Sequence, residues 1–132
     1  MARLGRITAL LLLLLASCAQ SELRHQLADL SPGDAGSGEK LFLQARDEAP
    51  PCASCHSIDG SQSLKAAPDL QGFAARAGSR VEGQSAQEYA FSSIVRPASY
   101  VVPGYANSMY ANYDRQLADS DLADLIAYLL TL

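Results

Sequence analysis

The sequence has no tryptophan, only two methionines and two histidines, and few basic residues. Its ten Lys and Arg against 14 Asp and Glu give a net charge of −4, which argues against nucleic-acid binding, because that depends on basic side chains at phosphates. Three cysteines cannot form a closed disulfide framework, so at least one has another role. At 132 residues, the chain has room for one compact domain and a targeting segment.

The first residues resemble a bacterial lipoprotein signal peptide. Arg3 and Arg6 precede an apolar run, residues 7–16, that is shorter than the roughly 20 residues needed to span a bilayer. The run ends in Leu-Ala-Ser-Cys, which resembles a lipobox, so the sequence predicts a lipoprotein signal peptide over residues 1–17. Cys18 is then the lipid anchor, and a diacylglyceryl group on it gives stable membrane attachment through two chains. An ordinary signal peptide with an incidental cysteine is the alternative.

Residues 18–37 are expected to form a lipid-anchored flexible tether. Their second half is rich in Ser, Pro and Gly, which is typical of turns and linkers, although leucines at helical spacing in the first half also allow a short helix. With residues 1–17 removed, eight basic and 14 acidic residues remain, a net charge of −6. An acidic surface favours partners with a basic docking patch.

Residues 38–132 predict an all-α domain made of a few short helices and long loops. Helices are expected at residues 38–45, 87–94 and 119–132, the last with an apolar stripe at three- and four-residue steps. Gly, Ser, Ala and Gln dominate residues 57–83, which predicts loops. Residues 97–114 are also irregular, and a loop of that length in a small domain is usually functional.

Cys52, Cys55 and His56 form the C-x-x-C-H pattern of c-type haem attachment. The two thiols add across the porphyrin vinyl groups, and the adjacent imidazole reaches the iron as its proximal ligand. A thioredoxin-like pair or a zinc site is the alternative, but alternating strands and helices are not predicted, and the other histidine, His25, lies in the predicted tether. An exported protein can also hold such a pair as a disulfide, which would constrain the chain little. The motif and the signal peptide together favour haem.

With this motif in place, residues 38–132 resemble the class I cytochrome c family. Gly38 and Phe42 are similar to the family's glycine and aromatic residue on the first helix, and Leu125 and Tyr128 are similar to their partners on the last helix. The resemblance implies a cytochrome c fold in which the first and last helices cross. Short helices and long loops then wrap around one covalently attached haem c.

The resemblance also implies further contacts to the haem. The segment 68–72 is similar to the family segment whose proline carbonyl accepts a hydrogen bond from the proximal histidine, which assigns that role to Pro68 and haem packing to Leu70.

Met109 is the expected distal ligand. It is the sole methionine once residues 1–17 are removed, and it lies in the irregular loop before the last helix. Tyr110 follows it where the family often has proline. Ala118 stands where the family often has a capping Ser or Thr, so Asp119 or Ser120 is expected to cap the last helix.

A histidine and a methionine together fill both axial positions, which leaves one-electron exchange as the chemistry.

The segment 94–105 is similar to loops of small bacterial cytochromes and of cytochrome domains fused to oxidase subunits. We therefore expect an exported electron carrier, not an enzyme, lipid-anchored on the periplasmic side of a bacterial membrane. Its expected partners are redox proteins such as a terminal oxidase or dehydrogenase, and no nucleic acid. The alternatives are a five-coordinate haem enzyme or gas sensor, and a fixed haem subunit of a membrane oxidoreductase.

Overall fold

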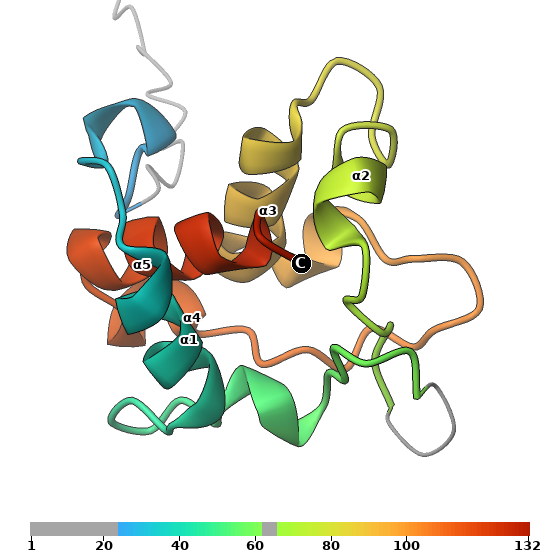
Figure 1. Ribbon diagram of the computed structural model, residues 1–132, viewed down its shortest axis with the longest axis horizontal. Coiled ribbons are helices and arrows are strands. Elements are labelled where there is room, and N and C mark those ends of the chain that lie inside the picture. The colour runs from blue at the N-terminus through green and yellow to red at the C-terminus, as the bar shows by residue number, and fades with distance from the viewer. Residues whose placement is uncertain (1–23, 62–65) are drawn as a thin grey trace, which may run out of the picture.

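The computed structural model describes residues 24–61 and 66–132, and the regular structure within these ranges is helical (Figure 1). The predicted signal peptide and Cys18 lie outside them. The α-helices are α1 (Ala35–Leu43), α2 (Phe73–Ala77), α3 (Ala86–Val95), α4 (Tyr113–Gln116) and α5 (Asp119–Leu129). Short 3-10 turns are η1 (Leu27–Asp29), η2 (Cys52–Ser54) and η3 (Pro97–Ser99). In the described part of the chain, every helix is too short or too polar to cross a membrane.

Helices α1 and α5 cross at very short range, as the fold class predicts (Figure 1). A Cβ on Gly38 would lie 2.0 Å from the carbonyl oxygen of Asp124 and 2.8 Å from Cβ of Tyr128, so only glycine fits at the crossing. Beside it, the rings of Phe42 and Tyr128 have centroids 5.5 Å apart, and Phe42 is almost completely buried. Leu125 is buried on the same helix. The crossing thus closes the core at this end of the domain.

The residue that caps the start of α5 is not the one predicted from the sequence. Its N-cap residue is Ala118, and the carboxylate of Asp121, three residues further on, accepts a hydrogen bond from the Ala118 N–H at 2.9 Å. The prediction that Asp119 or Ser120 takes this role is therefore wrong. The Asp119 carboxylate instead lies 2.5 Å from a ring nitrogen of His25.

The residues before α1 are folded onto the domain, which corrects the predicted flexible tether for residues 24–37. We call residues 24–34 the strap. His25 is buried, and a Cβ on Gly33 would lie 2.0 Å from the carbonyl oxygen of Ala123 in α5. Asp34 then caps α1 by accepting a hydrogen bond from the Ser37 N–H at 2.7 Å, so α1 begins three residues before the predicted start at Gly38.

Helix α3 agrees with its predicted range to within a residue at each end. Ser85 and Glu88 form a capping box at its start, with hydrogen bonds of 3.2 and 2.7 Å, and these bonds hold the pKa of Glu88 below its usual value. Helix α2, in contrast, lies inside the stretch predicted as loops. It begins after Gly72, whose φ of 68° is a left-handed conformation that favours glycine.

Candidate haem-binding site

The C-x-x-C-H motif begins with the single turn η2 and ends two residues after it. The N–H groups of Cys55 and His56 both donate to the carbonyl oxygen of Cys52, at 3.1 and 2.9 Å, which folds the five residues tightly. Ser54 donates from Oγ to the Pro51 carbonyl at 2.6 Å and holds the start of the turn. The two thiols are not joined in a disulfide. Cys52 is half-buried, and this burial raises its pKa to about 11, so it is a neutral thiol at pH 7.

The ring of His56 is oriented by the chain. Its Nδ1 lies 2.8 Å from the carbonyl oxygen of Pro68, the contact that the resemblance to cytochromes c implies. A carbonyl oxygen only accepts, so Nδ1 carries the hydrogen. The lone pair of this neutral tautomer is on Nε2, the atom suited to bind iron.

The buried carboxylate of Asp69 fixes the loop that carries Pro68. It accepts hydrogen bonds from the Ser57 hydroxyl, from the Gly60 N–H at 3.1 Å and from the Gln71 N–H at 2.8 Å. These bonds, the one from Ser57 first, hold the pKa of Asp69 below its usual value. Because Ser57 directly follows His56, the same carboxylate ties the loop back to the haem motif. Asp69 was not singled out from the sequence, since nothing near it marks a buried carboxylate.

A cavity of about 360 Å³ opens beside this loop. Every site residue predicted in the domain lines it, namely Cys52, Cys55, His56, Pro68, Leu70 and Met109. The other lining residues include members of α1, α2, α3, α4, α5 and the loop of residues 97–110, and are mostly apolar or aromatic. Segments separated by more than 50 positions in the sequence therefore meet around one space.

Aromatic side chains form much of the cavity wall. They are not among the site residues predicted from the sequence. They are Phe42, Phe73, Tyr89, Tyr100, Tyr105, Tyr110 and Tyr113. Tyr113 donates from its hydroxyl to the Pro50 carbonyl at 2.9 Å, and burial raises its pKa. Its ring meets that of Tyr110 edge-on, with centroids 5.1 Å apart. Tyr113 thereby joins α4 to the segment just before Cys52.

These residues fit a covalently bound haem. The cavity offers a mostly apolar wall for a large flat ring, two thiols on one turn, and an imidazole with a basic Nε2. Met109 lines the same cavity and carries a thioether, which would be available as a second ligand to the iron. His25, the other histidine, does not line the cavity, and both of its ring nitrogens contact oxygen atoms elsewhere. Among residues 24–61 and 66–132, the His, Cys, Asp and Glu side chains form no cluster able to hold a bare metal ion.

Comparison with known proteins agrees with this geometry. The family model for cytochrome c matches residues 35–132. The chain is 32% identical over 114 residues to a cytochrome c of Theileria parva, covering 74% of this chain and 84% of that protein. It is 33% identical over 108 residues to a cytochrome c of Theileria annulata, with the same coverage of both chains. The chain therefore belongs to the cytochrome c family, and it is an electron-transfer protein that carries covalently attached haem c.

Proposed function

We propose that this protein is a membrane-anchored cytochrome c with a single haem, which carries one electron at a time in a respiratory or related chain. The observation that carries the proposal is the joint placement of Cys52, Cys55, His56 and Met109 around one cavity. The haem iron, when bound, supplies the change between ferric and ferrous states.

The chain's own residues limit the chemistry to electron exchange. Cys52 and Cys55 hold the group covalently, and the hydrogen bond to Pro68 keeps the His56 ring in place. Met109 would supply the second protein ligand to the iron, which would leave no site for a substrate or a small gas. The apolar wall excludes water and raises the reduction potential together with the thioether ligand.

Electrons are expected to enter and leave near the exposed Cys55. Ile58, three residues further on, is 36% exposed and offers an apolar contact beside it. A mature net charge of −6 suits a redox partner with a basic docking patch, such as a terminal oxidase or a dehydrogenase. We place the protein on the periplasmic side of a bacterial membrane, held by a diacylglyceryl group on Cys18.

Expression with a cytochrome c maturation system tests the redox part of the proposal. The purified protein should take up one electron per haem reversibly, and its ferrous form should not bind carbon monoxide because both axial positions are filled. Binding of carbon monoxide by the wild type would instead support a five-coordinate enzyme or sensor. Copurification of a stable oxidoreductase complex would favour a fixed subunit over a free carrier.

Labelling with radioactive palmitate tests the anchor independently. The wild type should carry the label and sediment with membranes. The Cys18→Ser variant should lose the label and become soluble while it keeps its haem spectrum. Equal labelling of both proteins would reject Cys18 as the lipid site.

A further inference from the structure

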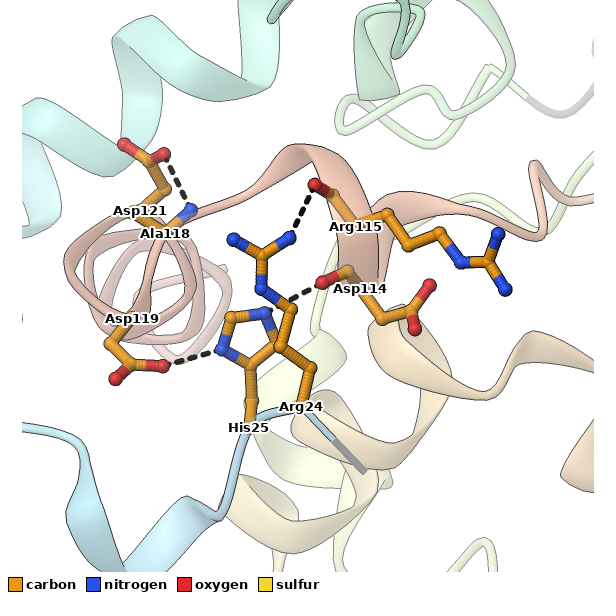
Figure 2. Close-up of polar contacts among 7 residues, drawn as sticks. All are labelled: Arg24, His25, Asp114, Arg115, Ala118, Asp119 and Asp121. Carbon is orange, nitrogen blue, oxygen red and sulfur yellow. Dashed lines mark hydrogen bonds and ion pairs between the residues drawn. The ribbon is translucent and has the colours of Figure 1, made fainter. Parts of the chain in front are cut away.

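The strap is clamped to the domain at its first described residues. His25 is only 4% exposed, with Nδ1 2.5 Å from the Asp119 carboxylate and Nε2 2.7 Å from the Asp114 carbonyl oxygen (Figure 2). The side chain of Asp119, in α5, and the backbone of Asp114, in α4, thus hold the His25 ring between the two helices.

Neighbouring contacts hold the strap along its length. Arg24 donates from Nη1 to the Arg115 carbonyl oxygen at 2.8 Å, beside His25 (Figure 2). Leu27 and Leu30 pack against the hydrophobic core. At the far end, the Asp34 N–H donates to the Asp124 carboxylate at 2.7 Å. The strap is thus part of the folded domain from Arg24 onwards.

This clamp shortens the connection to the lipid anchor. Arg24 is the sixth residue after Cys18. Six residues reach about 20 Å even when fully extended, whereas the 20 residues from Cys18 to Gly38 would reach about 70 Å. A domain of about 100 residues has a radius of gyration of about 13 Å, which makes a sphere about 34 Å across. The short connection cannot pass from the bilayer to the far side of such a domain, but the long one can.

The turn η1 of the strap and the segment of the haem motif lie at opposite edges of the domain in the view of Figure 1. Figure 1 shows η1 at the upper left and the segment 46–54, which contains η2, along the bottom, with α1 and α5 between them. If the strap side must stay close to the bilayer, the side that bears Cys52 and Cys55 points away from it.

We propose that the strap, clamped by His25 between α4 and α5, orients the anchored domain with the strap side against the bilayer and the haem motif facing the aqueous partner. This inference rests on the proposed lipid anchor at Cys18. It assigns the strap side to the membrane surface and reserves the opposite side for redox proteins.

Spin labels on the anchored holoprotein test this orientation. In the mature protein, Cys18 carries lipid and Cys52 and Cys55 carry haem, so an introduced cysteine is the one reactive thiol. Ala28→Cys on the strap and Glu48→Cys near the haem motif are both exposed positions. On vesicles whose headgroups chelate Ni²⁺, the label at position 28 should relax several-fold faster than the label at position 48. Equal relaxation at the two positions would overturn the proposal.

Two further variants separate the clamp from the length of the connection. His25→Ala should bring the two relaxation rates closer, since Leu27, Leu30 and Asp34 still hold the rest of the strap, whereas Gln26→Ala, an exposed neighbour, should leave them as different as in the wild type. Insertion of about 14 Gly and Ser residues after Gln20 restores the reach of the 20-residue connection. It should therefore bring the two rates together, and it leaves the strap intact if His25→Ala folds poorly. An unchanged difference in both the His25→Ala and the insertion variant would overturn the proposal. Failure of the wild type to float with vesicles would instead reject the anchor itself, and this inference with it.

Discussion

The α1–α5 crossing and the haem cavity are built in different ways. At the crossing, backbone meets backbone at Gly38, and the ring of Phe42 packs against that of Tyr128. The cavity wall comes largely from loops, which are positioned by single hydrogen bonds such as His56 to Pro68. The crossing therefore depends on shape, and the cavity depends on the chemistry of particular atoms. Substitutions in the first region should cost folding, and those in the second should change haem chemistry.

Removal of both thiols should have the largest effect. It should abolish covalent haem attachment at the cavity and leave the α1–α5 crossing unchanged. Cys52→Ser with Cys55→Ser leaves no atom that can form a thioether, so haem should be lost completely on extraction with acidic acetone. Denaturing electrophoresis followed by haem staining measures this loss. Ser54→Ala, between the two cysteines, should keep full staining. Staining of the double variant at the wild-type level would refute covalent attachment through these residues.

Gly38→Ala should disrupt the packing of α1 against α5 at the crossing. The new Cβ meets backbone of α5 at 2.0 Å, so the helices must separate, at a cost of about 3 kcal/mol in the free energy of unfolding. Urea unfolding of the holoprotein measures it.

Gly36→Ala is the matched control on the same helix. Its Cβ would have its nearest neighbour at 3.5 Å, an ordinary contact, so alanine should stabilise the protein by about 0.5–1 kcal/mol. Similar unfolding curves for the two variants would contradict the close crossing.

Met109→Ala should sharpen the contrast, because it changes the haem chemistry and largely spares the fold. Loss of the thioether opens an axial position, so the ferrous protein should bind carbon monoxide and the reduction potential should fall. The sulfur-to-iron charge-transfer band at the red end of the ferric spectrum should disappear as well. Ser108→Ala, the exposed neighbour, should keep the wild-type spectrum and potential. A variant that retains the band would show that Met109 only packs against the haem.

Asp69→Asn should have the smallest effect of these substitutions. The loss of folding stability that it causes should depend on pH. The folded-state pKa of Asp69 is lowered from 3.8, so its carboxylate stabilises the fold above about pH 4, and this contribution is lost as the pH falls through the lowered value. Thermal unfolding should show the variant melting below the wild type at pH 7. The difference should shrink towards pH 3, and a gap independent of pH would rule out the carboxylate as its source.

Local signals in the sequence were sufficient for much of this structure. The apolar stripe of α5 and the Pro that follows α3 predict those helices closely, because helix periodicity and Pro act within a few residues. Cys52, Cys55 and His56 are adjacent, so one motif identifies all three. The structure places them with Pro68, Leu70 and Met109 at one cavity, while their roles toward the haem stay predictions.

Other features depend on distant contacts and could not be predicted in this way. Helix α2 has five residues, too few for a periodic pattern. His25 is buried by Asp119, which is 94 positions away, and so a Ser-, Pro- and Gly-rich segment was interpreted as a tether. The cap of α5 falls to Asp121 because its carboxylate, three residues after Ala118, is placed to reach the Ala118 N–H.

One NMR measurement tests the central claim, that His56 and Met109 enclose a single haem. Met109 is the sole methionine once the predicted signal peptide with Met1 is removed, so labelling methionine methyl groups with ¹³C is expected to give one signal. In the ferrous holoprotein, a methyl group bound over the iron is shielded by the porphyrin ring, so the signal should move far upfield of the normal methionine region. A single methyl signal in the normal region would contradict the account, since Met109 would then lie away from the iron.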